Sequence, residues 1–341
     1  MEKRWVIKPK ADQKEVDHLA EILNINDLLA NLLVQRGIKT FDQAKKFFRP
    51  SLESLYDPFR MKDMNRAVER IEKAMHSNQK ILIYGDYDVD GTTSIAMVYS
   101  FLRKFYSNLD YYIPDRYAEG YGVSYKGINY AANNNVSLII ALDCGIKAVE
   151  KIDYANSLSI DFIICDHHTP EKSLPNAVAV LDPKRKDCTY PFKELSGCGV
   201  GFKMLQAFSR TNNIDPECLY PFLDLVAVSI ASDIVPIIDE NRILTFFGLK
   251  QLNSNPRAGL KAIIDVSGLG DKHHEIVVED IVFRIGPRIN ATGRLETGKN
   301  AVDLLITTNK RKPDHMAKTV NSCNDERNNI DRNITQNAIK M

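Results

Sequence analysis

The stretch KILIYGDYDVDG, residues 80–91, joins a short apolar run to three closely spaced aspartates. Its first six residues are typical of a strand buried on both faces, because apolar side chains follow one another almost without interruption. Four similar runs follow it: DYYIP at 110–114, SLIIAL at 137–142, DFIIC at 161–165 and AVAVL at 177–181. Helical patterns separate them near 91–106, 123–134 and 146–158, with a short helical link at 170–176. This alternation predicts an α/β fold with a five-stranded, mostly parallel sheet flanked by helices.

Helical extensions are expected on both sides of this sheet. The first 60 residues predict short helices broken by Pro50 and Pro58. Further helical patterns follow the sheet, at 200–211, 219–231 and 242–254, before an Arg- and Gly-rich segment near 276–300 and a polar terminal helix. We divide the chain into an N-terminal extension (1–60), a catalytic α/β domain (61–240), a helical and Arg-rich part of the core (241–312) and a connector helix (313–341). The polar last helix is expected to lead into a further domain.

Composition excludes several classes of protein. The 341 residues include 45 Lys and Arg against 44 Asp and Glu, and 44% are hydrophobic, which excludes a disordered chain. A net charge of +1 excludes a strongly basic coat, so any nucleic-acid site must come from local charge arrangement. No run approaches the roughly 20 apolar residues that span a bilayer, and no signal peptide is present, so we expect no membrane association and a cytoplasmic location. The six cysteines form no C-x-x-C pair and are expected to be reduced.

Acidic and imidazole side chains follow three of the five apolar runs. The candidates are Asp86, Asp88 and Asp90 after the first run, Asp143 after the third, and Asp166, His167 and His168 after the fourth, with Asp233 after a later apolar stretch. Ligands in open parallel sheets bind beyond the carboxyl ends of the strands, so these groups are expected to converge. One such aspartate alone would be read as a helix cap or turn former.

The carboxylates together require a different explanation. Several unpaired carboxylates at one sheet edge would repel each other, and these motifs contain no Lys or Arg. Divalent cations would remove the repulsion, and a carboxylate and imidazole set without thiolates suits Mn²⁺ or Mg²⁺, with Zn²⁺ or Co²⁺ as alternatives. More than four ligands indicates two metal ions, an arrangement suited to phosphoryl displacement.

Three motifs look like other known sites. Asp86 to Gly91 matches the start of an EF-hand, but Met97 occupies the twelfth position, where the loop requires Glu. The segment 293–300 resembles a P-loop, but Asn300 replaces its Ser or Thr. The segment GCGVGF at 197–202 has Phe202 where a dinucleotide fingerprint needs glycine, so we expect a glycine-rich turn that opens a helix.

Two groups of basic residues are candidates for contact with phosphate. Arg288, Asn290 and Arg294 lie in a segment whose Gly and Pro residues predict a rigid loop, and arginines suit bidentate phosphate contact. The alternative is that these arginines pair with acids elsewhere. Arg116 and Tyr117 follow the second run and combine a cation with an aromatic ring, which suits phosphate contact plus base stacking. The alternative is a tyrosine-rich loop packed on the sheet.

Six motifs in order carry a family resemblance. YGDYDVDGTTS, ALDCG, CDHHTP and SDIVP resemble the motifs of the DHH phosphoesterase superfamily. GCGVGFK and IGPRINATGR narrow the resemblance to the RecJ family of bacterial single-strand-specific exonucleases, over roughly residues 60–300. The resemblance implies a five-stranded parallel sheet, two divalent metal ions (Mn²⁺ preferred, Mg²⁺ as an alternative) and 5′-to-3′ hydrolysis of single-stranded DNA to mononucleotides in DNA repair and recombination.

The resemblance also implies roles for individual residues. It implies metal ligation by Asp88, Asp90, Asp143, His167 and Asp233, with Asp143 bridging the ions. His168 would face the scissile phosphate, Asp86 would support the ligands or join them, and Arg288, Asn290 and Arg294 would hold the phosphate backbone.

The sequence departs from the superfamily pattern in two places. Tyr84 stands where many members carry a His, which implies a more open shell for one metal, as in the RecJ family. The chain has no Gly-Gly pair, so the associated domain with its Gly-Gly-His motif and an oligonucleotide-binding fold are expected beyond Met341. Through them the protein would reach a single-strand-binding protein or a helicase, and we expect a monomer. The alternatives are a small-substrate phosphodiesterase for cyclic dinucleotides, very short RNA or pyrophosphate, and a non-catalytic DNA-binding homologue.

Overall fold

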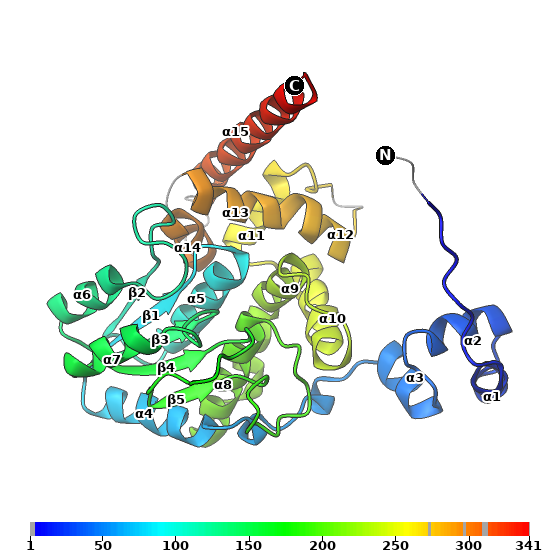
Figure 1. The fold of residues 1–341 in the computed structure, drawn as a ribbon, viewed down its shortest axis with the longest axis horizontal. Coiled ribbons are helices and arrows are strands. Elements are labelled where there is room, and N and C mark those ends of the chain that lie inside the picture. Colours follow the sequence, from blue (N-terminus) through cyan, green and yellow to red (C-terminus); the bar gives the residue numbers. More distant parts are fainter. Residues whose placement is uncertain (1–3, 272–273, 296–297, 309–312, 341) are drawn as a thin grey trace. The chain divides into compact units, whose positions relative to one another are not determined.

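The computed structural model describes residues 4–271, 274–295, 298–308 and 313–340, without the side chains of residues 294, 295 and 340 (Figure 1). Five strands form one sheet, namely β1 (Lys80–Gly85), β2 (Leu109–Tyr112), β3 (Val136–Leu142), β4 (Asp161–Cys165) and β5 (Ala179–Leu181). Their order is β2-β1-β3-β4-β5, and every neighbouring pair is parallel. The predicted five-stranded α/β sheet is therefore confirmed, with each apolar run placed on one strand.

Apolar side chains form continuous rows across this sheet. Ile83 of β1 pairs with Tyr111 of β2 and with Ile140 of β3, and the row continues through Ile163 to Ala179. Except for Tyr111, these residues are fully buried. Burial on both faces explains why the strands read as continuous apolar runs rather than as alternating ones.

Helices cover both faces of the sheet, which makes a three-layer α/β/α domain (Figure 1). One face packs against α6 (Tyr125–Asn133) and α7 (Val149–Ser157), where Leu82 and Ile139 share a core with Ile128 and Ile152. The other face packs against α4 (Met64–His76), α5 (Val89–Leu102) and α8 (Gly197–Thr211). The link at 170–176 contains no helix, contrary to the prediction, because Pro170 and Pro175 interrupt the backbone hydrogen bonds that a helix needs.

A second group of helices follows the sheet. It consists of α9 (Leu223–Ser232), α10 (Asp239–Ser254), α11 (Ala258–Val266), α12 (Val278–Asp280), α13 (Gly286–Leu295), α14 (Gly298–Ile306) and α15 (Pro313–Lys340). The prediction of a rigid loop around Arg288 was wrong, because a π-helical turn at Ile281–Ile285 runs directly into α13. Pro287 lies in the first turn of α13, where its missing N–H is not needed, and the wide turn before it relieves the clash with the preceding carbonyl.

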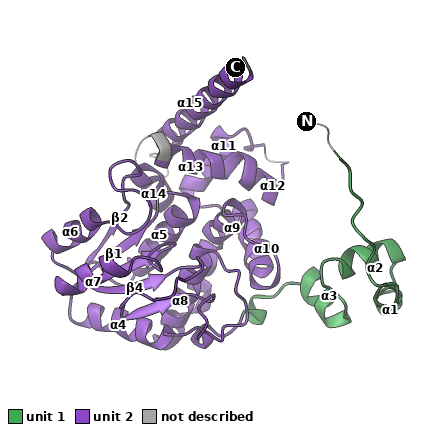
Figure 2. Cartoon of the chain, viewed as in Figure 1, with its two compact units in different colours: residues 1–55 green, residues 56–341 purple. Residues whose placement is uncertain are grey.

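The first 55 residues form a compact unit of their own (Figure 2). This unit contains α1 (Gln13–Leu23), α2 (Asp27–Val34) and α3 (Phe41–Phe48), as the sequence predicted, and α3 ends just before Pro50. The second unit comprises residues 56–341. Our finer boundaries near residues 60, 240 and 312 stay predictions. Among the described residues, no helix has the length and apolar content that crossing a membrane requires.

Candidate metal centre at the strand ends

The strand order opens a crevice between β1 and β3. The chain leaves β1 toward β2 on one side and leaves β3 toward β4 on the other, so the loops after these two strands diverge. Such switch points are where open parallel sheets bind ligands. Asp86 follows β1 directly and Asp143 follows β3, while His167 and His168 follow the neighbouring β4.

The first motif turns sharply from β1 into α5. The carboxylate of Asp88 caps α5 by accepting a 2.9 Å hydrogen bond from the Gly91 amide, and Asp90 lies in the first turn. A Cβ on Gly91 would lie only 2.4 Å from the backbone oxygen of Asp86, so this turn requires glycine. The turn places three carboxylates within five residues while α5 begins immediately.

Backbone amides at the start of α8 hold the Asp90 carboxylate. Asp90 Oδ2 accepts a hydrogen bond of 2.7 Å from the Gly197 amide, and Oδ1 accepts one of 2.8 Å from the Cys198 amide. The Ser229 hydroxyl donates a third, also 2.8 Å long, to Oδ1. The glycine-rich segment therefore opens a helix, as predicted, and it also fixes the orientation of a candidate ligand. A Cβ on Gly197 would lie 2.6 Å from the Cβ of Asp143, so α8 could not approach so closely with a larger residue.

Three carboxylates lie around the ring of His167. Its Nε2 lies 3.1 Å from Asp143 Oδ1, 3.6 Å from Asp233 Oδ2 and 3.8 Å from Asp90 Oδ2. Two sets of three ligand atoms each lie within 4.8 Å of one another: Asp143, His167 and His168 form one set, and Asp90, His167 and Asp233 form the other. His167 therefore belongs to both sets. Asp143 has φ of 58°, a left-handed conformation that is costly for an aspartate and recurs at functional sites.

Several polar atoms in this cluster lack hydrogen bonds. Within the part of the chain that the structure describes, both ring nitrogens of His167, Oδ1 of Asp143 and Oδ2 of Asp86 are buried without a hydrogen-bond partner. Leaving such atoms unsatisfied costs about 1–3 kcal/mol each, and native proteins leave few of them. Carboxylate and imidazole atoms left unpaired beside one another are the donor set that fits a divalent cation.

The acid–base properties of the cluster agree with this interpretation. Burial, followed by the charge of Asp88, raises the pKa of Asp86 to about 7, and burial and the charge of Asp90 raise that of Asp233 to about 7. Burial and the neighbouring carboxylates raise the pKa of Asp143 well above its usual value, and burial lowers the pKa of His167. The metal-free cluster therefore favours protonated carboxyls and a neutral imidazole. A bound cation would displace the protons and would be ligated by the neutral imidazole.

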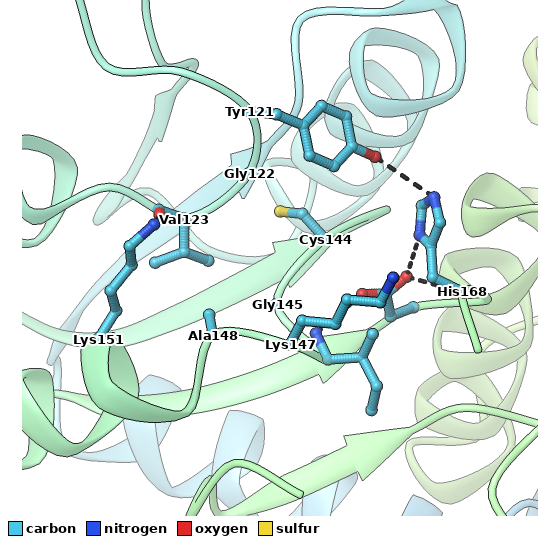
Figure 3. Close-up of a pocket in the computed structure, with 11 residues that line it drawn as sticks. Tyr121, Gly122, Val123, Cys144, Gly145, Lys147, Ala148, Lys151 and His168 are labelled. Atoms are coloured by element: carbon cyan, nitrogen blue, oxygen red, sulfur yellow. Dashed lines mark hydrogen bonds and ion pairs between the residues drawn. The ribbon is translucent and has the colours of Figure 1, made fainter. Parts of the chain in front are cut away.

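His168 has a different environment. Its Nδ1 lies 2.7 Å from Asp166 Oδ1, and this hydrogen bond raises the pKa of the imidazole. Its Nε2 lies 3.4 Å from the hydroxyl of Tyr121 on the opposite wall of a small cavity (Figure 3). Burial acts to raise the pKa of Asp166, but the hydrogen bond and charge of His168 and the amide of Ile146 outweigh it, so the pKa is lowered. Asp166 orients His168, a role that the sequence analysis missed.

Tyr84 holds the loop that lies over the first motif. Its hydroxyl donates a 3.0 Å hydrogen bond to the Gly122 carbonyl and accepts one from the Ser124 amide. The Gly122 amide in turn lies 3.3 Å from Oδ1 of Asp86. Tyr84 thus contributes structural support at the position where many superfamily members carry histidine.

The predicted DNA-contacting residues lie in two places. The Arg116 guanidinium lies 5.0 Å from the ring centroid of Tyr87, inside the first motif, and the side chain of Tyr117 is 80% exposed. Arg288 instead donates to the Asn321 side chain of α15 and to the Arg284 carbonyl.

Helix α13 does reach the centre at its other end. A Cβ on Gly293 would lie 2.5 Å from the Tyr87 carbonyl oxygen. Asn290 is half-buried one turn earlier, and the side chain of Arg294 lies outside the described residues. The structure therefore brings Arg116 to the metal-ligand candidates and directs Arg288 toward α15.

Comparisons with known proteins agree with this arrangement of the strand ends. Residues 80–230 match the family model described as the DHH family, N-terminal domain. The matched residues include all five strands and the loops that carry Asp88, Asp90, Asp143 and His167.

The chain is also similar to curated exonucleases. It is 40% identical over 340 residues to the single-stranded-DNA-specific exonuclease RecJ of Bacillus subtilis, covering 99% of this chain and 42% of the relative. It is 31% identical to RecJ of Escherichia coli, covering 96% of this chain and 58% of the relative. The chain thus spans about half the length of these relatives.

Solved structures agree in fold. The crystal structure of RecJ from Thermus thermophilus in complex with Mn²⁺ matches with a TM-score of 0.83 and 24% identity, over 98% of this chain and 47% of that one. A crystal structure of exonuclease RecJ bound to manganese matches with a TM-score of 0.76 and 27% identity, over 84% and 71%.

Proposed function

We propose that this chain is the catalytic part of a metal-dependent exonuclease that hydrolyses single-stranded DNA from the 5′ end to 5′-mononucleotides, in DNA repair and recombination. The observation that carries the proposal is the pair of three-atom ligand sets that share His167 at the switch point of the sheet. The similarity to curated single-stranded-DNA-specific exonucleases supports the choice of single-stranded DNA as the substrate.

Two divalent metal ions fit the ligand atoms. Asp90, Asp143, His167 and Asp233, whose ligand atoms lie close together, would hold the ions together with Asp88. Asp86 would support these ligands indirectly, because its carboxylate accepts a hydrogen bond from the Gly122 amide and so helps to fix the loop beside them. We favour Mn²⁺, with Mg²⁺ as the alternative, because the ligands are oxygen and imidazole nitrogen atoms. When bound, the ions would supply Lewis-acid polarisation of the phosphate and an activated water.

The chain's own residues would bind and orient the phosphodiester. His168, whose pKa is raised by its hydrogen bond to Asp166, would donate a hydrogen bond to a non-bridging phosphate oxygen and stabilise its developing negative charge. Arg116, whose charge already lowers the pKa of Asp86, would contact a second phosphate, and the exposed ring of Tyr117 offers a surface for base stacking. Three residues of α13 would contact the DNA backbone farther from the scissile phosphate: Arg288, Asn290 and Arg294.

The decisive experiment compares the two ends of a single strand. Oligonucleotides labelled at the 5′ or the 3′ end are digested in Mn²⁺ by the unaltered chain, by Asp143→Ala and by Asp153→Ala, a control at an exposed position of α7. We expect labelled mononucleotide to appear first from the 5′ end, with activity lost at least 100-fold in Asp143→Ala and retained in Asp153→Ala. Preferential cleavage of a dinucleotide over the longer strands would instead identify a small-substrate phosphodiesterase.

Other features stay predictions at this stage. They are the monomeric state, the cytoplasmic location and an interaction with a single-strand-binding protein or a helicase.

A further inference from the structure

A cavity of about 210 Å³ lies beside the candidate metal centre (Figure 3). Its walls come from the loops that follow β2, β3 and β4, together with the start of α7. His168 belongs both to this wall and to one of the two ligand sets. A group that leaves the phosphate bound at the metal centre can therefore enter the cavity directly.

The lining suits a flat, uncharged group. Val123, Cys144, Ile146 and Ala148 supply apolar surface, and the ring of Tyr121 stands at one side. Cys144 is buried and adds the small, soft surface of a thiol to this lining.

The polar side chains of the lining are arranged around the apolar surface. Lys151 Nζ donates a 2.6 Å hydrogen bond to the Val123 carbonyl, which ties two walls together, and Lys147 is exposed at the rim. Both oxygens of Asp166 accept hydrogen bonds, one from His168 and one from the Ile146 amide. The carboxylate that lines the cavity is thus already engaged, and the wall favours contact through aromatic and apolar faces, which all four bases offer.

The volume distinguishes between the two sides of a scissile phosphate. The volume of 210 Å³ is smaller than the roughly 300–1,000 Å³ of pockets for drug-sized ligands. It therefore has room for one nucleoside base but not for a continuing strand. An exonuclease has a single nucleotide on one side of the phosphate it cleaves and the polymer on the other.

We propose that this cavity holds the base of the terminal nucleotide and so fixes the cleavage step at one residue. This inference rests on the proposed function. Because Tyr121 and apolar surface make the contact, the site accepts every base but discriminates against a terminal residue that has none.

The test fills the cavity and removes the base. Ala148→Phe places a ring in the cavity, Ala148→Leu is a milder version, and Ala338→Phe makes the same change at an exposed position of α15. Each protein digests a 5′-phosphorylated strand that ends in thymidine and the same strand ending in an abasic tetrahydrofuran residue, with Mn²⁺. In parallel, calorimetry compares the binding of thymidine 5′-monophosphate with that of deoxyribose 5-phosphate.

The ratio of the two strands, with and without the terminal base, is the readout. We expect the unaltered protein and Ala338→Phe to prefer the base-containing strand and monophosphate at least tenfold, and both Ala148 variants to lose most of that preference. Equal preference in all variants, or none in the unaltered protein, would overturn the inference. If no strand is cleaved by any protein, the proposed function fails, whereas the binding ratio still decides whether the cavity takes a base.

Discussion

The Nε2 atom of His167 lies 3.1 Å from Oδ1 of Asp143, yet within the described residues neither atom has a hydrogen-bond partner. Two buried polar atoms that lie this close without hydrogen bonding are poorly stabilised by protein alone. A cation between the strand ends would satisfy both. His167 has a further property, since it belongs to both ligand sets whereas Asp233 belongs to one.

Removal of His167 should therefore weaken metal binding more than removal of Asp233. We expect His167→Asn to weaken Mn²⁺ binding more than Asp233→Asn, because the buried His167 ring lies within 3.8 Å of three carboxylates. Calorimetric titration with Mn²⁺ measures the affinity and stoichiometry of each variant, and Asp153→Asn on the exposed side of α7 is the control. Equal losses in both variants would contradict a central position of His167 among the ligands.

Asp166 should act through His168 and not through the metal. Because the Asp166 carboxylate raises the pKa of His168, Asp166→Asn should lower that pKa and move the alkaline limb of the rate profile to lower pH. We expect a loss of about 100-fold in kcat at pH 8, the lower end of what a single positioned acid–base group contributes. The pH–rate profile of the variant measures this.

A matched pair of measurements separates this role from a structural one. The increase in Tm on adding Mn²⁺ should stay close to that of the unaltered protein in Asp166→Asn. The double variant with His168→Gln should lose no more activity than His168→Gln alone, since the two residues act as a unit. Additive losses would show that Asp166 acts independently.

The sequence predicts the strands of this fold better than its loops and its later helices. The five strands were predictable because burial on both faces imposes continuous apolar runs, and the residues that follow β1, β3 and β4 were predictable from the geometry of parallel sheets. Helix α13 was predicted as a loop because Gly286 and Pro287 disfavour a helix interior, whereas both lie in its first turn.

The partners of the ligand candidates were less accessible to sequence reasoning. Asp90 is held by backbone amides of Gly197 and Cys198 and by Ser229, all more than 100 residues away. Backbone amides have no sequence signature, and a serine in an apolar helix resembles a small core residue. The serine inside the apolar run of α9, one turn before Asp233, was the single signal available.

A buried ion pair joins α8 to α10. Lys203 and Glu240 are both fully buried, with Nζ 3.1 Å from Oε1, and Lys203 also donates to the Tyr56 carbonyl while Tyr190 donates to Glu240. Glu240→Ala would leave the ammonium of Lys203 without its counter-charge. We expect a loss of about 3–5 kcal/mol in the free energy of unfolding.

Denaturation in urea measures this loss. The surface pair Lys261–Asp265, with both side chains about half exposed, provides the matched control, and Asp265→Ala should cost under about 1 kcal/mol. The double variant Lys203→Met with Glu240→Gln removes both charges and should recover part of the lost stability. A loss under 1 kcal/mol for Glu240→Ala would contradict the assignment of a buried charge pair.

The stability of the metal-free protein should fall as the pH rises. Asp86 and Asp233 have pKa values near 7 in the folded chain against a reference value of 3.8, so between these values the native state holds protons that the unfolded chain has released. The stability that these groups contribute is complete below pH 3.8 and is lost as the pH rises through about 7. Bound Mn²⁺ would compensate the charges, so its stabilising effect should grow over the same range.

Thermal unfolding with EDTA and with Mn²⁺ at pH 5.5, 6.5 and 7.5 tests this dependence. We expect the difference in Tm between the two conditions to increase at each step. Asp86→Asn, which removes one of the buried carboxylates but keeps its shape, should flatten the decline of the metal-free protein, whereas Asp153→Asn should not. A Tm difference that is constant with pH would mean that these carboxylates are already ionised in the metal-free fold.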